Sequence, residues 1–190
     1  MSVAVAVRKG HMIAIAADTQ ENFGDRRVLR ADHGSRKILK IGGSYVAQTG
    51  WGLYENILGD YLKKVGAPRL GNEREIFAFF NRLWKRMRKD YSFVNDQSLD
   101  NDKSPFADLD AAFLVVNRGG IFHVTGQMSV TRFKRYDAIG SGGPYALGAL
   151  NALYDGPLRA PEIARRACAA AVDLDVSCGG ELDVFTLAVR

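Results

Sequence analysis

The sequence predicts an α+β fold, and a four-layer αββα sandwich is the arrangement that best buries its apolar faces. Short runs of small and β-branched residues occur in two groups and once more at the C-terminus, as in buried strands. Each group is followed by two segments whose apolar residues recur at helical spacing. Two stacked sheets with a helix pair on each outer face would cover all of these surfaces, although other α+β folds share the same order of elements.

The N-terminal half contains the first group. Lys9 and Gly10 can turn the chain between two apolar runs, and Gly42 with Gly43 can do so between the next two. Asn72 suits the N-cap of a helix with one broad apolar face. We expect strands at residues 3–7, 12–17, 35–40 and 44–48, an irregular polar stretch at 19–33, and helices at 53–65 and 72–91.

The second group follows a long segment, residues 95–108, that lacks periodicity and is rich in Asp, Asn and Ser. A loop of this length in a compact domain is usually functional or disordered. Pro144 and Pro161 each suit the first turn of a helix. We therefore expect one domain over residues 1–190 with an acidic loop inserted at about 95–108. The expected strands are 111–117, 120–124, 128–133, 136–139 and 182–189, and the expected helices begin near 144 and 161.

The composition excludes several classes of protein. Hydrophobic residues make up 47% and charged residues 25%, and no apolar run approaches the roughly 20 residues of a membrane span. The first residues lack a basic segment before an apolar helix, so we expect a cytoplasmic protein. Cys168 and Cys178 have no CxxC spacing and the three histidines are far apart, so we expect no disulfide, no metal and no cofactor.

The charge is unevenly distributed. A net charge of +5 raises the possibility of nucleic-acid binding. Residues 96–108 hold four aspartates against one lysine, while much of the excess positive charge lies on one expected helix, at Arg82, Lys85, Arg86, Arg88 and Lys89. Basic helix faces are more often solvated or placed at subunit contacts, so we expect no nucleic-acid partner.

The second residue suggests a catalytic group. An N-terminal serine can act alone, because its hydroxyl attacks while its free α-amine takes the proton, and Ser2 qualifies once Met1 is removed. The amine titrates at about 7.7 to 8.0, and a neighbouring cation would lower its pKa. Lys37 is a candidate for this cation, and Asp18 could orient Lys37 if their strands fold side by side. Singly, each residue is also explained as an ordinary surface side chain.

Two glycine-containing turns are further candidates. Gly50 lies between an expected strand and an expected helix, where backbone N–H groups can point at a developing oxyanion. Ser141 lies in a Gly-Ser-Gly-Gly-Pro run that could cradle a phosphate, but no complete nucleotide-binding motif is present. An ordinary strand-to-helix turn explains either position when it is considered alone.

In their order along the chain, these residues resemble the proteasome β-subunit and HslV family over nearly the whole sequence apart from the acidic loop. The glycine-rich run resembles HslV, whereas the long loop and the serine look more like the betaproteobacterial proteasome homologue. The segments that carry the resemblance are Val3-Ala-Val-Ala-Val-Arg8, Gly10-His11, Ala17-Asp18, Lys37, Thr49-Gly50, Gly140-Ser-Gly-Gly-Pro-Tyr145 and Asp175-Val-Ser-Cys-Gly-Gly180.

The resemblance implies the αββα fold of N-terminal-nucleophile hydrolases and a self-compartmentalising peptidase. Its sites would face the inside of a homo-oligomeric double ring of twelve or fourteen subunits, and its substrates would be peptides or unfolded proteins, with or without an unfoldase partner. Ser2 would be the nucleophile and its amine the base, Lys37 would lower the amine's pKa, Asp18 would orient Lys37, and the Gly50 amide would bind the oxyanion.

Further positions receive roles from the same resemblance. Ser141 and Asp175 match positions that hold hydrogen bonds around the terminal amine. Ser35, Gln48 and Gly52 match the pocket for the residue before the scissile bond.

Two positions depart from the family pattern. Ser2 replaces the usual threonine, whose methyl group restricts its rotamer. Cys178 stands where serine or threonine is commoner, which weakens or removes one hydrogen bond near the site. The alternatives to an active peptidase are a non-catalytic ring subunit that keeps Met1 and a nucleic-acid-binding module that uses the basic helix.

Overall fold

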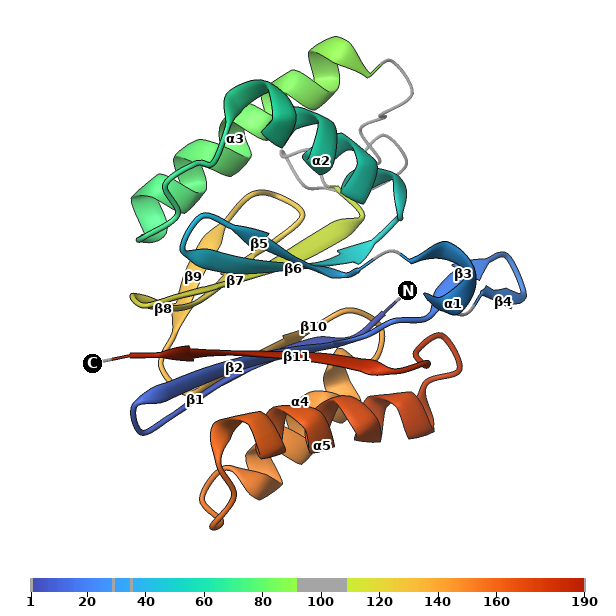
Figure 1. Cartoon of the computed structure of the whole chain (residues 1–190), viewed down its shortest axis with the longest axis vertical. Coiled ribbons are helices and arrows are strands. Elements are labelled where there is room, and N and C mark those ends of the chain that lie inside the picture. The colour runs from blue at the N-terminus through green and yellow to red at the C-terminus, as the bar shows by residue number, and fades with distance from the viewer. Residues whose placement is uncertain (1, 29, 35, 92–108, 190) are drawn as a thin grey trace, which may run out of the picture.

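The computed structural model describes residues 2–28, 30–34, 36–91 and 109–189. Four layers are visible in Figure 1: a helix pair, a sheet, a second sheet and a second helix pair. The predicted αββα sandwich is therefore confirmed. The expected loop at 95–108 and the expected pocket residue Ser35 lie outside the described residues.

The N-terminal strand lies in the interior of the first sheet. This sheet has the order β10-β1-β2-β11, and Ala4 of β1 pairs with Ala17 on one side and Ile139 on the other. Its strands are β1 (Ala4–Lys9), β2 (Met12–Asp18), β10 (Tyr136–Ile139) and β11 (Leu182–Ala188). Antiparallel neighbours thus hold the start of the chain from both sides.

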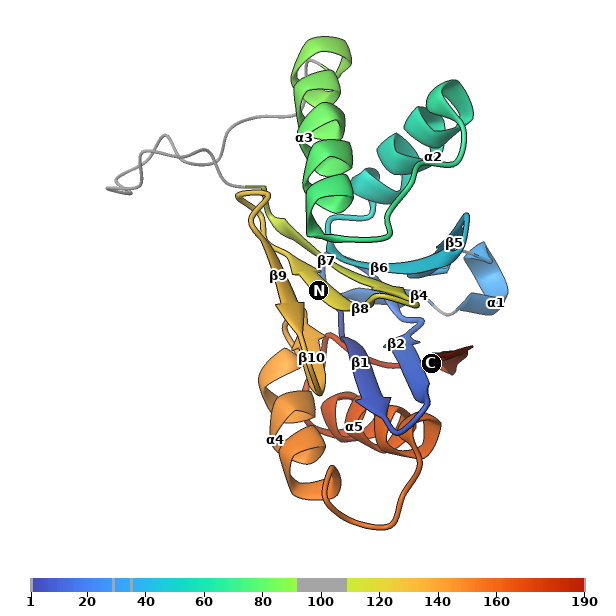
Figure 2. The same cartoon turned by 90° about the vertical axis from the view of Figure 1, so that its left-hand side faces the viewer.

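The second sheet has the order β5-β6-β7-β8-β9. Figure 2 shows how the chain passes from β9 in this sheet to β10 in the other. Its strands are β5 (Ile38–Ile41), β6 (Ser44–Gly50), β7 (Ala111–Asn117), β8 (Gly120–Val124) and β9 (Val130–Phe133). The hairpins predicted at Gly10, at Gly42 and before Gly120 all form.

Three of the helices begin where Asn72, Pro144 and Pro161 predict. The Asn72 side chain accepts a hydrogen bond from the Glu75 backbone N–H at 3.0 Å, as an N-cap does. Pro144 and Pro161 each occupy a first turn. The helices are α2 (Leu53–Val65), α3 (Glu73–Asp90), α4 (Gly143–Leu153) and α5 (Ala160–Leu174).

Three apolar clusters separate the four layers. One lies between α2, α3 and the second sheet, another between α4, α5 and the first sheet, and the third between the two sheets. Side chains alternate along β1 and the residue before it. Val3, Val5 and Val7 face the helices, while Ala4 and Ala6 face the other sheet. Within the described residues, no helix is long and apolar enough to cross a membrane.

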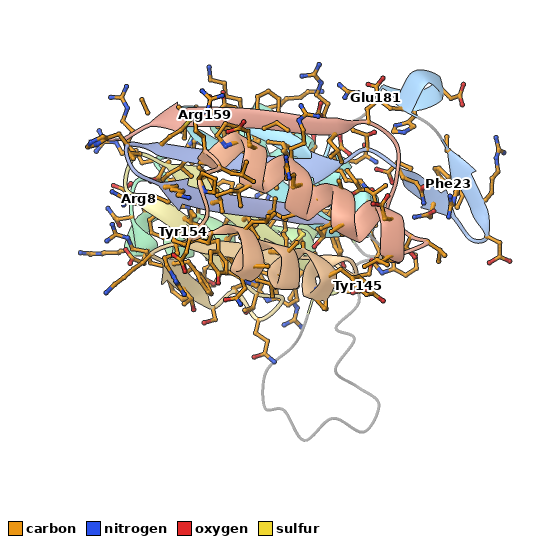
Figure 3. The ribbon with its side chains drawn as sticks, turned by 90° about the horizontal axis from the view of Figure 1, so that it is seen from below. Arg8, Phe23, Tyr145, Tyr154, Arg159 and Glu181 are labelled. Atoms are coloured by element: carbon orange, nitrogen blue, oxygen red, sulfur yellow. The ribbon has the colours of Figure 1, made fainter. Side chains whose placement is uncertain are left out.

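The stretch at 19–33 is not irregular, which corrects the prediction. It forms β3 (Glu21–Phe23), β4 (Arg26–Val28) and a short helix α1 (Arg30–His33). The β3–β4 hairpin projects from one end of the sandwich, and Figure 3 shows Phe23 at that end, far from Arg8. Three-residue strands with mainly polar side chains have no apolar period, so sequence patterning could not find them.

Candidate active site

Ser2 is enclosed at the start of β1. Only 4% of the residue is exposed, and its carbonyl accepts the backbone N–H of Gly142 at 3.3 Å. The Ser141 hydroxyl makes a longer contact of 3.5 Å to the same carbonyl. A side chain at Gly140 would place its Cβ 2.1 Å from this oxygen, and Gly140 has a φ of +92°, so only glycine fits. The glycine-rich turn after β10 therefore packs against Ser2.

Asp18 connects three parts of the site. Its Oδ1 accepts the backbone N–H of Val3 at 3.0 Å and the Lys37 ammonium at 2.8 Å. Its Oδ2 accepts the backbone N–H of Gly179 at 3.0 Å. The Asp18 side chain is fully buried and that of Lys37 is 7% exposed. One carboxylate thus fixes the start of β1, the lysine and the loop after α5.

Asp18 and Lys37 meet although they do not come from neighbouring strands of one sheet. Asp18 ends β2 in the first sheet, whereas Lys37 immediately precedes β5 in the second. Their ion pair therefore crosses the interface between the sheets. A buried pair is costly to desolvate, and removing one partner leaves an uncompensated charge worth roughly 3–5 kcal/mol.

Gly50 lies next to Ser2, at the end of β6. Its φ is +113°, and a Cβ there would lie 2.2 Å from the carbonyl oxygen of Asp110. No other residue can adopt this backbone so close to β7 without displacing it. Ser2 and Gly50 line the same two hollows in the surface.

Ser141 and Asp175 form a polar network with the loop after α5. The Asp175 carboxylate accepts the Ser177 backbone N–H at 2.9 Å and a weak bond from the Cys178 thiol at 3.4 Å. Burial raises the pKa of Asp175, but hydrogen bonds outweigh it, first from Ser177 and then from Ser141, so its pKa is lowered. Asp175 is therefore an anion at neutral pH, and it reaches Ser2 through Ser141.

Cys178 keeps its proton. Burial, followed by the negative charges of Asp18 and Asp175, raises the pKa of this thiol to about 12. A neutral thiol can donate to Asp175, but sulfur is a weaker donor than a hydroxyl. The hydrogen bond from Cys178 to Asp175 is therefore present but weak, which agrees with the weakened hydrogen bond that the sequence predicts at this position.

Two hollows meet at Ser2. The narrow one is lined by Lys37 and Gly50 together with Gln48 and Gly52, two of the expected pocket residues. The wider one, of about 720 Å³, passes Ser141 and continues along Trp51 and Asp110. The structure thus brings four of the six expected catalytic residues to the hollows, with Asp18 and Asp175 behind them.

Sequence reasoning missed two acidic residues in the narrow hollow. Glu21 begins β3, in the stretch that was predicted to be irregular, and Glu55 lies in the first turn of α2. Burial raises the pKa of Glu55, and the negative charge of Glu21 raises it further. The only sequence signal was the position of Glu55 shortly after the Gly50–Gly52 turn. Within the described residues, no three His, Cys, Asp or Glu side chains are grouped to hold a metal ion.

Comparisons with known proteins bear on the class of protein. No protein-family model matches the chain. It is 31% identical over 194 residues to the ATP-dependent protease subunit HslV of Caulobacter sp. (strain K31), covering 96% of this chain and 92% of the relative. It is 29% identical over 189 residues to HslV of Roseobacter denitrificans, covering 96% and 91%.

Two solved structures share the fold. Thiobacillus denitrificans BPH, in complex with epoxomicin, has a TM-score of 0.89 and 32% identity over 99% of both chains. HslV from Trypanosoma brucei has a TM-score of 0.66 and 23% identity over 98% of this chain and 99% of its own, which supports the fold alone.

The fold and these relatives define a class of protein, the N-terminal-nucleophile hydrolases with peptidase activity. The chain belongs to the proteasome β-subunit and HslV family. The resemblance seen in the sequence is therefore confirmed, while the roles of the individual site residues stay predictions.

Proposed function

We propose that this peptidase subunit hydrolyses peptide bonds with Ser2 as its nucleophile, once Met1 has been removed. The observation that carries the proposal is the buried Asp18 carboxylate, which binds Lys37 and the Val3 backbone together beside Ser2. An ammonium ion held there lowers the pKa of a neighbouring α-amine, so that more of the amine is neutral at pH 7.

The reaction follows from this arrangement. The Ser2 hydroxyl attacks the peptide carbonyl while the neutral α-amine takes its proton, and the Gly50 amide donates to the oxyanion. The protonated amine then gives its proton to the leaving amine, which leaves an ester on Ser2 Oγ. A water molecule, deprotonated by the same α-amine, attacks the ester. The amine then returns the proton to Ser2 Oγ as the acyl–oxygen bond breaks, which releases the new carboxyl end and restores the free hydroxyl and amine.

Ser141 and Asp175 position the nucleophile. The anionic Asp175 accepts the Ser141 hydroxyl, and Ser141 and Gly142 lie against the Ser2 carbonyl. Because Asp18 accepts the next N–H, that of Val3, the peptide group that follows Ser2 is held at both its oxygen and its nitrogen. A serine without the restraining methyl of threonine depends on this fixation more.

The subunit is proposed to act inside a closed double ring of twelve or fourteen copies, about 250 to 300 kDa from a 20.9 kDa chain. Several large apolar side chains are exposed, and contacts between subunits would cover them. They include Phe23 (68%), Trp51 (61%), Leu174 (62%) and Val176 (77%). Since its relatives are ATP-dependent protease subunits, we assign substrate delivery to a separate ATP-driven unfoldase. The free thiols Cys168 and Cys178 suit a reducing cytoplasm.

Mass spectrometry of the protein, native and denatured, tests the proposal. The denatured mass should lack one methionine, and the native mass should equal the double ring. A peptide epoxyketone, which closes a ring across an adjacent hydroxyl and amine, should add once per chain at Ser2, whereas a Ser2→Ala control should not react. With Met1 attached, the Ser2 nitrogen is an amide and cannot act as a base.

Retention of Met1 in an assembled ring that takes up no epoxyketone would contradict this mechanism. The chain would then be the non-catalytic ring subunit.

A further inference from the structure

We propose that the narrow hollow beside Ser2 selects lysine or arginine as the residue before the scissile bond, with Glu21 and Glu55 as the residues that determine this specificity. The inference rests on the proposed function of Ser2 and deepens it. It adds a substrate class to a site whose expected pocket residues, Gln48 and Gly52, carry no charge.

Position assigns the narrow hollow to this residue of the substrate. When Ser2 attacks a carbonyl whose oxygen points to the Gly50 amide, the substrate Cα lies one bond away, about 1.5 Å. Its side chain therefore enters one of the two hollows that Ser2 and Gly50 line. We assign it to the narrow one, because Gln48, a pocket residue by the family resemblance, lines this hollow and not the wider one. The wider hollow past Trp51 and Asp110 leaves room for the extended chain on either side.

Two carboxylates reach this hollow from different elements. Oε2 of Glu21 lies 3.8 Å from the position that a Cβ on Gly52 would occupy. The Glu55 carboxylate accepts the backbone N–H of Arg36 and is partly buried. Both residues line the same hollow, and the negative charge of Glu21 raises the pKa of Glu55, so the two groups lie within electrostatic reach of each other.

The remaining charged groups do not cancel this negative field. Lys37 also lines the hollow, but its ammonium is paired with Asp18 at 2.8 Å. Arg36 is exposed and contacts Glu55 through its backbone. The Lys37–Asp18 pair has no net charge. Among the described residues that line the hollow, Glu21 and Glu55 then face one arginine, which leaves a net negative charge. His33 of α1 adds a positive charge near Glu55 only when it is protonated.

The walls of the narrow hollow combine apolar and acidic groups. Leu39 and Thr49 line the hollow and offer apolar surface to an aliphatic stem. A lysine or arginine head between Glu21 and Glu55 would relieve the repulsion between the two carboxylates, whereas an acidic side chain would add a third like charge. A neutral side chain of the same length would gain the stem contacts alone.

A panel of fluorogenic peptides that differ only before the scissile bond tests the inference. Arginine and lysine peptides should exceed the norleucine peptide in kcat/KM by roughly tenfold or more, the effect of one charge-assisted hydrogen bond. Glu55→Gln and Glu21→Gln should each reduce this ratio several-fold, since glutamine keeps the shape and loses the charge. Glu55→Lys should shift the preference toward a glutamate peptide. Glu73→Gln, at the exposed start of α3, is the matched control and should leave the ratio unchanged.

A binding measurement tests the selection of the peptide by the pocket separately from its hydrolysis by Ser2. Fluorescence anisotropy with Ser2→Ala protein should show the same order of affinities for the same peptides. Equal or weaker binding of the arginine peptide relative to norleucine would overturn the specificity and leave the nucleophile untouched. Charge-selective binding by Ser2→Ala, together with no hydrolysis by the unsubstituted protein, would support the pocket and count against the proposed function.

Discussion

Replacing Asp18 by asparagine should destabilise the protein and abolish peptide hydrolysis together. Asparagine has nearly the same shape, but one oxygen becomes an NH₂ group that cannot accept a hydrogen bond. In either orientation of the asparagine amide, its NH₂ group points at a hydrogen-bond donor. The reason is that Val3 and Lys37 donate to Oδ1 and Gly179 donates to Oδ2. The Lys37 ammonium also loses its counter-charge in a site where it is only 7% exposed.

The size of the effect follows from this burial. An uncompensated charge of a broken buried pair costs roughly 3–5 kcal/mol, and the lost hydrogen bond is part of that figure. For a domain of 190 residues, each kcal/mol lowers the unfolding midpoint by roughly 2–4 °C, so we expect a decrease of about 6–20 °C. Hydrolysis should cease because Lys37 loses the carboxylate that holds its ammonium in place beside Ser2.

Circular dichroism on heating, at matched protomer concentration, measures the loss of stability, and a fluorogenic peptide measures activity. Asp60→Asn is the control, because Asp60 also pairs with a lysine, at 2.7 Å, but its side chain is 44% exposed. Its midpoint should change far less than that of Asp18→Asn. An Asp18→Asn protein that melts with the Asp60→Asn control and still cleaves the peptide would refute the reasoning.

Two more predictions concern the neighbours of Ser2. Gly50→Ala should lower the unfolding midpoint and abolish hydrolysis, because its Cβ would lie 2.2 Å from the Asp110 carbonyl oxygen; Gly59→Ala, in α2 with open space around it, should not. The preference for arginine over norleucine should fall as pH falls through the pKa of Glu55. Since burial and Glu21 raise that pKa, the fall should occur at higher pH than for an ordinary carboxyl, and a ratio constant down to pH 4 would argue against a role for Glu55.

The sequence predicts the elements whose side chains alternate or repeat. The alternation of Val3, Val5 and Val7 with alanines defines β1, and the position of Asn72 fixes the start of α3. These signals are local, because burial of one face imposes a period on a strand or helix. The four-layer arrangement could then be inferred from element order, and the structural match to BPH agrees with it.

The elements around residues 19–33 escape such reasoning because distant contacts stabilise them. The Asn22 side chain donates to the Ser177 carbonyl at 2.9 Å, and Arg27 donates to the Val176 carbonyl at 2.9 Å. Arg30 forms an ion pair with Asp183 on β11 at 2.7 Å. Each contact joins residues about 150 positions apart, so no window of local sequence contains it.

Some residues of the candidate site can also be predicted from the sequence, whereas others are found only in the fold. Asp18 and Lys37 stand out once they are considered with Ser2, although their contact requires two stacked sheets and not two neighbouring strands. Glu21 and Glu55 give no such signal, because a glutamate in a polar stretch or in the first turn of a helix has an ordinary explanation. Only the fold places both beside one hollow.

The residues that the sequence indicates also stabilise the fold, whereas the two glutamates that only the fold reveals are proposed to select the substrate. Asp18 joins the two sheets and the loop after α5, so the same carboxylate serves stability and chemistry, and no substitution there can change one alone. Glu21 and Glu55 lie at the start of a hairpin outside the two sandwich sheets and in the first turn of a helix. Both are only partly buried, so their charges can change without opening a cavity in the core. Substitutions at these two positions should therefore redirect cleavage while the unfolding midpoint stays near that of the original protein.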